Sequence, residues 1–449
     1  MATSASLPSA PPAVAAEASR LDVMNFLNEI AGRYPQAISL ASGRPAEAFF
    51  DVQDQARRIP EYVGYLQAAR GGDFDATWNL LAQYGPTNGL INDLVAAQLA
   101  LDEGVSCAPS QVLVTAGCQE AMALCATTLC PQADDVLLVR SPTYIGITGI
   151  ADLNGIELAA FSCAPGDSIV RALADSVAAV ERRGKRPRAL YLVPDFDNPT
   201  GVVLTRAERE QIIGFCAARR IVVLEDNPYG MFRFDGVPVP RMAALDGAGC
   251  VVYLGTYAKT LCPALRVGFA VVPSALFGDP GGSADLLAAL SRAKSFATVN
   301  TSQFAQAIVG GILLAEGGSL ARRIAPAIEF YRRNRDAMTD ALAAAFAPGD
   351  GVHWNRPEGG FFMTVSLPFE FGRDQAQCCA NDYGVLTMPL SFFALDHAED
   401  RRVRLAFSNS DPDRIRAGVA RFARFVHDQL ASGAAASARP QAVRQGAAA

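Results

Sequence analysis

Short apolar stretches recur through the middle of the chain, and segments with a helical pattern separate most of them. Continuous apolar stretches rich in β-branched residues are typical of strands that a sheet buries on both faces. Strands that alternate with helices, such as Gln119–Leu129 and Arg206–Ala218, predict an α/β fold with an open, mostly parallel sheet. The predicted strands are Val112–Thr115, Val136–Arg140, Leu158–Phe161, Ala189–Val193, Ile221–Glu225, Val251–Gly255 and Arg266–Val272.

The pattern changes on either side of this block. A helical and loop region, Leu21–Glu103, precedes it. Two long helical patterns follow it, and the last region combines short strands with a final helix. These elements are predicted at Ala284–Ala315, Leu320–Ala347, Phe361–Ser366, Val403–Phe407 and Pro412–Leu430.

This organisation predicts two domains. Residues 84–315 form the large domain, and both ends of the chain, residues 21–83 and 316–431, form a smaller α+β domain. The Ala/Ser/Pro-rich residues 1–20 and the Ala/Gly/Ser-rich residues 432–449 have the composition of disordered tails.

Composition narrows the class of protein. The chain has 449 residues, 50% hydrophobic and 19% charged, which is enough for a large buried core. A net charge of −6 argues against nucleic acid or a membrane as a partner, and the apolar stretches are too short to span a bilayer.

The ten cysteines form no regular framework, which favours a reducing, cytoplasmic compartment, and three scattered histidines make a metal site improbable. The N-terminus lacks the pattern of a signal peptide.

Lys259 is the most informative residue. It follows a predicted strand in Gly255-Thr256-Tyr257-Ala258-Lys259, and Arg266 lies seven positions later. A lysine in apolar surroundings beside another cation has a lowered pKa, which makes it a nucleophile. By itself it would be interpreted as a surface lysine. Other residues, however, match what pyridoxal phosphate (PLP) requires: a carboxylate for the pyridine nitrogen, donors for the phosphate and a cation for the substrate carboxylate.

Asp226 fits the carboxylate, since it follows the strand Ile221–Glu225 and would keep the pyridine ring protonated. Tyr229 and Asn198, the latter in the turn Asn198-Pro199-Thr200-Gly201, would donate hydrogen bonds to the phenolate oxygen of the cofactor. Each residue also has an ordinary interpretation, as a cap, a half-buried tyrosine or a turn residue.

The segment Thr115–Gln119 joins a strand to a helix, and backbone N–H groups at a helix N-terminus bind anions. Tyr144 would stack on the pyridine ring, unless it is a plain core aromatic. Arg404, in an alternating strand, would bind the substrate carboxylate through two hydrogen bonds, although a surface arginine is the alternative. The phosphate would be bound by Gly117, Cys118, Gln119, Thr256 and Arg266.

Together these motifs resemble those of class I/II aminotransferases of PLP fold type I, over most of the chain. The branch that the sequence most resembles contains aminoadipate-type and aromatic aminotransferases and the effector domains of MocR-type regulators. The matching motifs are Ser42-Gly43-Arg44-Pro45, Tyr84-Gly85-Pro86-Thr87, Thr115–Gln119, Asn198–Gly201, Asp226–Tyr229, Gly255–Lys259, Arg266-Val267-Gly268, Gly359-Gly360-Phe361 and Arg404–Ser408.

The resemblance implies a homodimer in which Tyr84 reaches the phosphate of the partner subunit's cofactor and the backbone of Gly43 contacts the substrate carboxylate. Relatives often have serine at the positions of Cys118 and Ala258. Four further departures, at Arg44, Asp197, Thr364 and Leu390, are expected to line the substrate entrance. Arg44 would pair with a polar or anionic group of the substrate side chain, or else with Glu47 on the surface.

The expected activity is transfer of an amino group between an amino acid and a 2-oxo acid by a ping-pong mechanism. Lys259 would hold the cofactor and move the Cα proton, with Asp226 and Tyr229 supporting the ring. Two segments, Leu21–Glu29 and Ala41–Glu47, resemble arylglycine transaminases such as dihydroxyphenylglycine transaminases, so the substrate is expected to be aromatic, an arylglycine or aminoadipate-like.

Three alternatives stay open at this point. The same cofactor residues would serve a β-lyase, a cyclase or an amino-acid oxidase. A protein that only binds an effector is the second alternative, but the residues before the matching region are too few for the helix-turn-helix domain of a MocR-type regulator. The third is a protein that has lost catalysis and serves as an assembly partner, and the intact set of Lys259, Asp226 and Arg404 argues against it.

Overall fold

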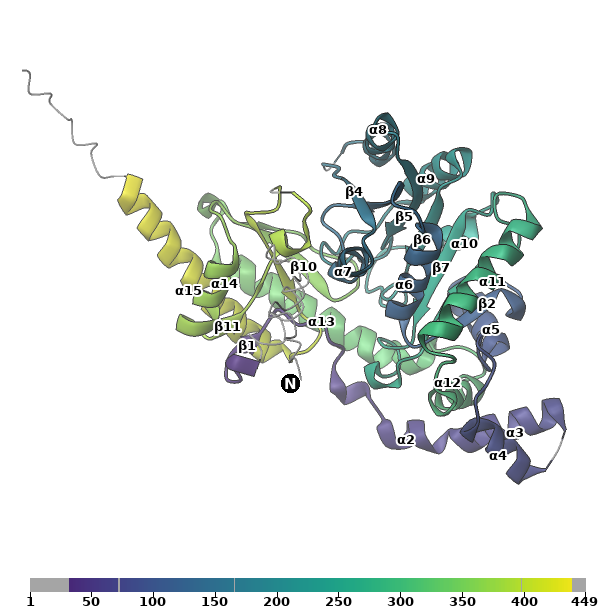
Figure 1. The fold of residues 1–449 in the computed structure, drawn as a ribbon. Helices are drawn as coiled ribbons and strands as arrows, with labels where there is room; N and C mark the ends of the chain where they lie inside the picture. The colour runs from purple at the N-terminus through teal and green to yellow at the C-terminus, as the bar shows by residue number, and fades with distance from the viewer. Residues whose placement is uncertain (1–31, 72, 165, 397, 438–449) are drawn as a thin grey trace, which may run out of the picture.

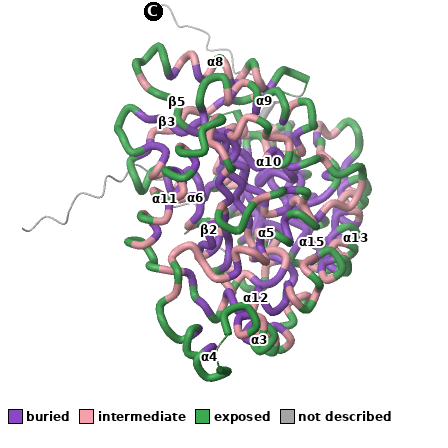
Figure 2. The backbone as a smooth tube through the Cα atoms, turned by 90° about the vertical axis from the view of Figure 1, so that its right-hand side faces the viewer, coloured by how far each residue is buried: buried purple, intermediate pink, exposed green. Residues whose placement is uncertain are grey.

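The computed structural model describes residues 32–71, 73–164, 166–396 and 398–437. The predicted N-terminal tail and the segment Leu21–Glu29 lie outside these residues. Two parts lie side by side, a large sheet flanked by helices and a smaller sheet packed on long helices (Figure 1). Buried residues run through the centre of the molecule, whereas exposed residues dominate α4 and the outer loops (Figure 2).

The large sheet has seven strands in the order β2-β8-β7-β6-β5-β3-β4. Only β8 runs antiparallel to its neighbours, so the predicted α/β fold with a mostly parallel sheet is confirmed. Its strands are β2 (Val112–Thr115), β3 (Asp135–Arg140), β4 (Glu157–Phe161), β5 (Arg186–Leu192), β6 (Val222–Asp226), β7 (Val251–Thr256) and β8 (Gly268–Val271).

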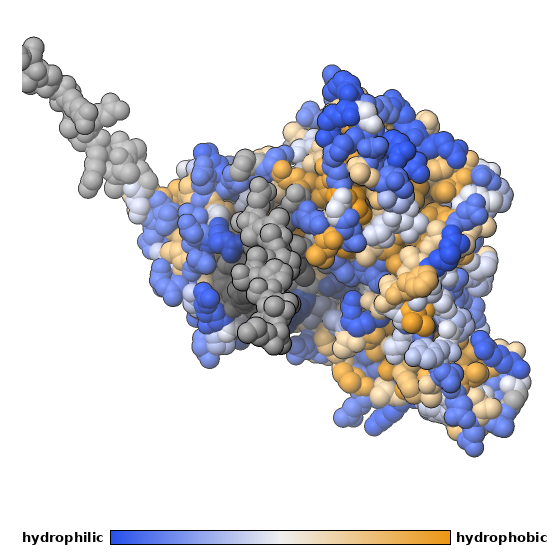
Figure 3. Space-filling view, viewed as in Figure 1, coloured by the Kyte–Doolittle hydropathy of each residue, from blue (hydrophilic) through white to orange (hydrophobic). Residues whose placement is uncertain are grey.

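Helices cover both faces of this sheet because its apolar residues alternate between them. In β3, Leu137 and Val139 belong to one core cluster, and Val136 and Leu138 to another on the opposite face. The face of Leu137 is covered by α6 (Cys118–Leu129), α7 (Ile145–Asn154) and α11 (Pro280–Ala297). The other face is covered by α8 (Ile169–Arg182), α9 (Arg206–Arg219) and α10 (Met242–Leu245), and hydrophilic residues gather over α8 and α9 (Figure 3).

Beyond β7, a third core cluster lies between the sheet and α5 (Asn92–Asp102) and α12 (Gln303–Ala315). Helices α2 (Val52–Arg57), α3 (Ile59–Arg70) and α4 (Phe74–Ala82) pack against α12. The domain prediction had grouped these helices with the smaller domain. The structure differs because the apolar side chains of α3 and α4, such as Tyr62 and Leu81, are buried with those of α12.

The smaller part contains a four-stranded sheet in the order β12-β13-β10-β9 and a separate pair, β1 with β11. Long helices pack beside it, with α13 running between the two parts (Figure 1). The elements are β1 (Ile38–Ser39), β9 (His353–Trp354), β10 (Phe362–Ser366), β11 (Val385–Leu386), β12 (Met388–Pro389), β13 (Arg402–Ala406), α13 (Ala321–Ala345), α14 (Arg373–Asp382) and α15 (Pro412–Ser437).

Several predicted boundaries were wrong. The single helix expected at Ala284–Ala315 is two helices, because the chain turns between them and Val299 has a left-handed backbone, with φ 66°. The last helix continues beyond Leu430 to Ser437, into the tail predicted to be disordered. The strand expected from Arg266 begins at Gly268, since Arg266 itself has φ 50° and ends a 3₁₀ turn.

Local sequence signals explain several element ends. Thr205 begins α9 with a capping box, in which its hydroxyl accepts from the backbone of Glu208 and Glu208 accepts from the backbone of Thr205. No helix among the described residues is long and apolar enough to cross a membrane. In the same part of the chain, no cluster of His, Cys, Asp and Glu side chains has the arrangement of a metal site.

Candidate active site

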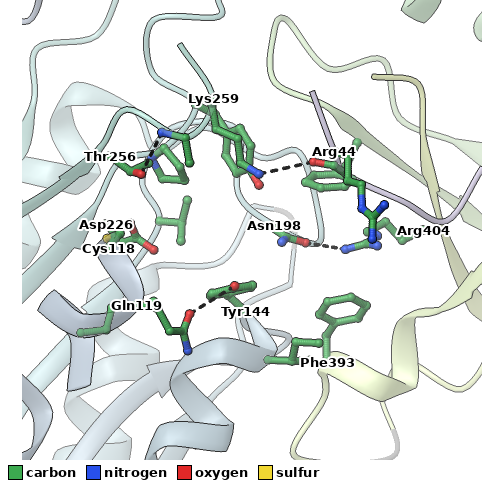
Figure 4. A pocket seen from close by; sticks show the side chains of 18 of the residues that line it. Arg44, Cys118, Gln119, Tyr144, Asn198, Asp226, Thr256, Lys259, Phe393 and Arg404 are labelled. Atoms are coloured by element: carbon green, nitrogen blue, oxygen red, sulfur yellow. Dashed lines mark hydrogen bonds between the residues drawn. The ribbon is translucent and has the colours of Figure 1, made fainter. Parts of the chain in front are cut away.

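A cavity of about 270 Å³ lies at the carboxyl ends of the parallel strands, where ligands bind in open α/β sheets. In Figure 4, Cys118 and Asp226 lie on one side of this cavity and Arg44 and Arg404 on the other, with Lys259 and Asn198 between them. The large sheet and the smaller part therefore both contribute side chains to one site.

Lys259 follows β7 on a short loop, and its Nζ donates to the carbonyl oxygen of Gly43 at 3.5 Å. Burial lowers the pKa of Lys259 to about 8. The charge of Asp226 opposes this effect, whereas Arg266 and Arg404 lower the pKa further. An amine with this pKa is neutral in a large fraction of molecules near pH 8, as a nucleophile must be.

Asp226 is the last residue of β6 and is buried. One carboxylate oxygen accepts a hydrogen bond from the Tyr191 hydroxyl at 2.6 Å, and the other accepts from the Cys118 thiol at 3.2 Å. Burial raises the pKa of Asp226, although these two donors favour the ionised form. The two donors fix the orientation of the carboxylate in the cavity wall.

The predicted phosphate residues meet at the N-terminus of α6. Gly117 caps this helix with φ 83°, a conformation that favours glycine. A Cβ at Gly117 would overlap the Arg266 guanidinium, so glycine allows the arginine to lie against the helix N-terminus. Thr256 lies at the end of β7, where its hydroxyl accepts from the backbone N–H of Ala258 at 3.1 Å.

Arg404 is held from several sides. It donates to the side-chain oxygen of Asn198 at 2.7 Å and to the carbonyl oxygen of Ala41 at 2.6 Å. Its guanidinium lies between the rings of Phe362 and Phe393, at 4.4 Å and 4.7 Å from their centroids. Burial lowers its pKa to about 10, and its Nε has no hydrogen-bond partner among the described residues. The group is therefore rigid and still has donor capacity for a ligand.

Two tyrosines form part of the cavity wall. The Tyr144 hydroxyl donates to the Gln119 side chain at 3.5 Å, and burial raises the pKa of Tyr144 to about 12. Tyr229 is buried with its ring edge-on to Phe361 and Phe362, and burial raises its pKa as well. Both side chains are therefore neutral at physiological pH and can donate a hydrogen bond.

Most of the predicted site residues line this one cavity. Gly117 lies just behind it, beside Arg266, and Tyr84 lies away from it, with 80% of its surface exposed. The residues that line it are Gly43, Arg44, Cys118, Gln119, Tyr144, Asn198, Asp226, Tyr229, Thr256, Lys259, Arg266 and Arg404.

The departures expected at the substrate entrance were located correctly only for Arg44. Asp197, Thr364 and Leu390 are buried and are not among the cavity residues. Burial raises the pKa of Asp197 to about 6, and its carboxylate accepts from the Thr200 hydroxyl at 2.6 Å. These three residues therefore lie outside the lining of the cavity.

Sequence reasoning missed part of the wall. Met122 lies one helical turn after Cys118, so helical spacing gave a signal for it. Tyr191 lies in the predicted strand next to that of Asp226, but only the sheet order shows the contact. Tyr191 does not line the cavity itself but donates to Asp226, which does. Besides Met122, the missed cavity residues are Ile145, Val193, Pro228, Ala258, Phe362 and Phe393.

The residues present fit PLP. Lys259, Arg44, Arg266 and Arg404 give the cavity four cations, and Asp226 is its one acid among the described residues. This excess of positive charge suits a ligand set with a phosphate and a carboxylate. The helix N-terminus with Arg266 provides a phosphate site, and Asp226 provides the carboxylate that a pyridine nitrogen needs.

Comparison with known proteins agrees with the geometry. The sequence profile of the family described as Aminotransferase class I and II matches residues 39–422. The chain is 38% identical over 413 residues to the (S)-3,5-dihydroxyphenylglycine transaminase of Amycolatopsis orientalis. The aligned region covers 91% of this chain and 92% of that protein. It is 30% identical over 399 residues to Aromatic-amino-acid aminotransferase 1 of Thermococcus litoralis, with 88% of each chain covered.

Solved structures lead to the same family. Pyrococcus horikoshii kynurenine aminotransferase in complex with PMP superposes with a TM-score of 0.78 at 27% identity, over 94% of this chain and 97% of that chain. The α-aminoadipate aminotransferase of Thermus thermophilus, complexed with N-(5'-phosphopyridoxyl)-L-leucine, has a TM-score of 0.72 at 26% identity, over 91% and 99%. These relatives do not favour a β-lyase, cyclase or oxidase. The chain belongs to the class I and II aminotransferase family and is a PLP-dependent aminotransferase of fold type I.

Proposed function

We propose that this aminotransferase takes the amino group from an arylglycine or a related aromatic amino acid and passes it to a 2-oxo acid by a ping-pong mechanism. The observation that carries the proposal is the aromatic lining of the cavity, in which Phe362 and Phe393 lie beside Arg404, where the substrate carboxylate would bind. Aromatic walls favour a flat aromatic side chain. The similarity to a relative named as a dihydroxyphenylglycine transaminase supports the same substrate class.

In this proposal PLP, when bound, supplies an aldehyde that takes up the amine and a ring that takes up the electrons of the Cα–H bond. Asp226, oriented by Tyr191 and Cys118, would accept a hydrogen bond from the protonated pyridine nitrogen. Asn198 and Tyr229 would donate to the ring oxygen, and Tyr144 would pack against the ring; all three line the cavity. Gly117, Cys118, Gln119, Thr256 and Arg266 bind the phosphate.

When PLP is bound, the Nζ of Lys259 would hold the aldehyde, and the same Nζ would accept the proton from Cα of the substrate. Its lowered pKa suits this role, because the amine must be free to accept a proton near neutral pH. Arg404 would bind the substrate carboxylate, and Gly43, which lines the same cavity, would contact it through its backbone. The fixed position of Arg404 between two aromatic rings would hold the substrate in one orientation in the cavity.

Arg44 indicates a preference for substrates whose side chain carries a polar or anionic group. Its side chain is exposed at the cavity, and it has no ion pair with Glu47 or any other described residue. The backbone carbonyl of Arg44 is fixed by the Ser408 hydroxyl at 2.7 Å. We propose that the guanidinium donates to ring hydroxyl groups of the substrate; a distal carboxylate, as in an aminoadipate-like substrate, is the second candidate because it suits the same donors.

We also propose that the protein forms a homodimer. Apolar side chains stay exposed on adjacent segments at the start of α12, with Tyr84 80%, Phe296 93%, Val299 46% and Phe304 46% exposed. Gln303 joins these segments by donating to the carbonyl oxygen of Gln83 at 2.5 Å. Exposed apolar surface of this kind favours a subunit interface. There Tyr84 would reach the cofactor phosphate of the partner subunit, and analytical ultracentrifugation of wild type and Tyr84→Glu tests the interface.

The ten free cysteines support a cytoplasmic enzyme. A place in the biosynthesis of peptide antibiotics, which contain arylglycines, depends on the arylglycine preference.

The decisive experiment mixes the holoenzyme with one amino acid at a time, without a 2-oxo acid, and follows the cofactor absorbance together with the 2-oxo acid formed. Phenylglycine and dihydroxyphenylglycine should react fastest, and Lys259→Ala should form no product. A reaction with aminoadipate or glutamate alone would contradict the arylglycine preference. In Arg44→Leu the advantage of the dihydroxylated ring over phenylglycine should disappear, whereas the exposed control Arg401→Leu should keep it.

A further inference from the structure

Lys294 is a buried cation outside the cavity. It lies on α11, its side chain is 0% exposed, and its Nζ donates to Glu120 at 2.9 Å and to the Thr298 hydroxyl at 3.0 Å. Thr298 in turn donates to the second oxygen of Glu120 at 2.5 Å. A buried, charged lysine without a partner would be strongly destabilising. The ion pair with Glu120 therefore offsets the cost of burying the charge of Lys294.

Glu120 connects this cluster to the phosphate-binding turn. It is the third residue of α6, and its carboxylate accepts the backbone N–H of Ala116 at 2.5 Å. Ala116 immediately precedes Gly117, and its carbonyl oxygen accepts from Arg266 at 3.4 Å. The position of the turn relative to Arg266 therefore depends on Glu120.

The charge of Glu120 would be unfavourable without Lys294. A carboxylate in the first turn of α6 is attracted to the same positive helix end as a phosphate, and it repels that phosphate. Because Lys294 is fully buried and only 10% of the Glu120 side chain is exposed, solvent and salt screen this repulsion weakly. Lys294 neutralises the carboxylate while leaving it in place to hold the turn.

We propose that Lys294 and Glu120 are positioning residues for the cofactor phosphate: Glu120 fixes the turn at Ala116, and Lys294 cancels its charge. The inference rests on the phosphate site in the proposed function. A purely structural contact between α11 and α6 is the competing explanation. The two explanations differ in whether the effect of losing Lys294 depends on a phosphate group on the ligand.

The test compares dissociation constants for PLP and for pyridoxal, which lacks the phosphate, by absorbance titration. For Lys294→Met we expect the constant for PLP to rise at least about tenfold, a difference of about 1.4 kcal/mol, and the constant for pyridoxal to change less than about twofold. The double variant Lys294→Met/Glu120→Gln, which removes both charges, should bring PLP binding back to within about threefold of wild type. Lys185→Met removes a lysine paired with Glu157 far from the site and should match wild type.

Equal losses for PLP and pyridoxal, or unchanged PLP binding, would overturn the inference. Lys294→Gln keeps a hydrogen-bond donor and has the same expectation, so it covers the case in which Lys294→Met does not fold. A wild-type protein that binds PLP no more tightly than pyridoxal would instead show that the proposed phosphate site is wrong.

Discussion

Replacing Lys259 with glutamine should stabilise the protein when no cofactor is bound. Burial lowers the pKa of Lys259 from 10.5 to about 8, so holding the protonated amine in the folded cavity costs free energy. One pKa unit corresponds to about 1.4 kcal/mol, which gives a cost of about 3 kcal/mol at pH 7. Glutamine has a similar length and no charge, so Lys259→Gln removes this cost.

The effect has a defined dependence on pH. Below about pH 8 the amine is protonated in both the folded and the unfolded chain, and the cost is constant. Between pH 8 and 10.5 the unfolded chain binds the proton more tightly than the folded chain, so the free energy of unfolding rises with pH through this window. The advantage of Lys259→Gln over wild type should therefore fall from about 3 kcal/mol at pH 7 to below about 1 kcal/mol at pH 10.

Urea unfolding of both cofactor-free proteins at pH 7 and pH 10, followed by circular dichroism, measures the difference. Lys185→Gln serves as the matched control and should show no gain at either pH. A Lys259→Gln variant that is less stable than wild type at pH 7, or a gain that is the same at both pH values, would refute the reasoning.

Substitutions at three further positions test individual contacts. In the proposed function Arg404 binds the substrate carboxylate through two hydrogen bonds, which a lysine cannot reproduce, so for Arg404→Lys kcat/KM for amino acids should fall about 10- to 100-fold, while the rate with a primary amine lacking a carboxylate should not. Gly117→Ala forces a side chain into a left-handed position against Arg266, so PLP titration should show at least about tenfold weaker binding. Cys118→Ser keeps a donor to Asp226 and should retain kcat within about threefold, whereas Cys118→Val should lower it at least about tenfold.

The sequence predicted the chemistry of the site because its polar motifs follow apolar strands. Asp226 and Thr256 end two adjacent parallel strands, and Asn198 and Lys259 lie on loops that follow such strands. Residues at the carboxyl ends of parallel strands come together in any fold of this class. Their convergence in the structure therefore required no knowledge of long-range packing.

The sequence did not show which helices and strands pack against each other. Helical periodicity shows which side of α3 is apolar, but not that this side packs on α12. Local pattern also missed the break between α11 and α12, because the left-handed backbone of Val299 has no glycine to mark it.

Features that depend on neighbouring residues can be predicted from the sequence, whereas contacts between residues far apart in the chain cannot. The approximate positions of the strands of the large sheet and the candidate roles of Lys259, Asp226 and Arg404 depend on short motifs of neighbouring residues, so the sequence by itself predicted them. The hydrogen bond from Tyr191 to Asp226, the ring of Phe362 against Arg404 and the pair of Lys294 with Glu120 join residues 35 or more positions apart. Only the tertiary structure decides such contacts, because burial and close packing select one partner among many chemically equivalent ones.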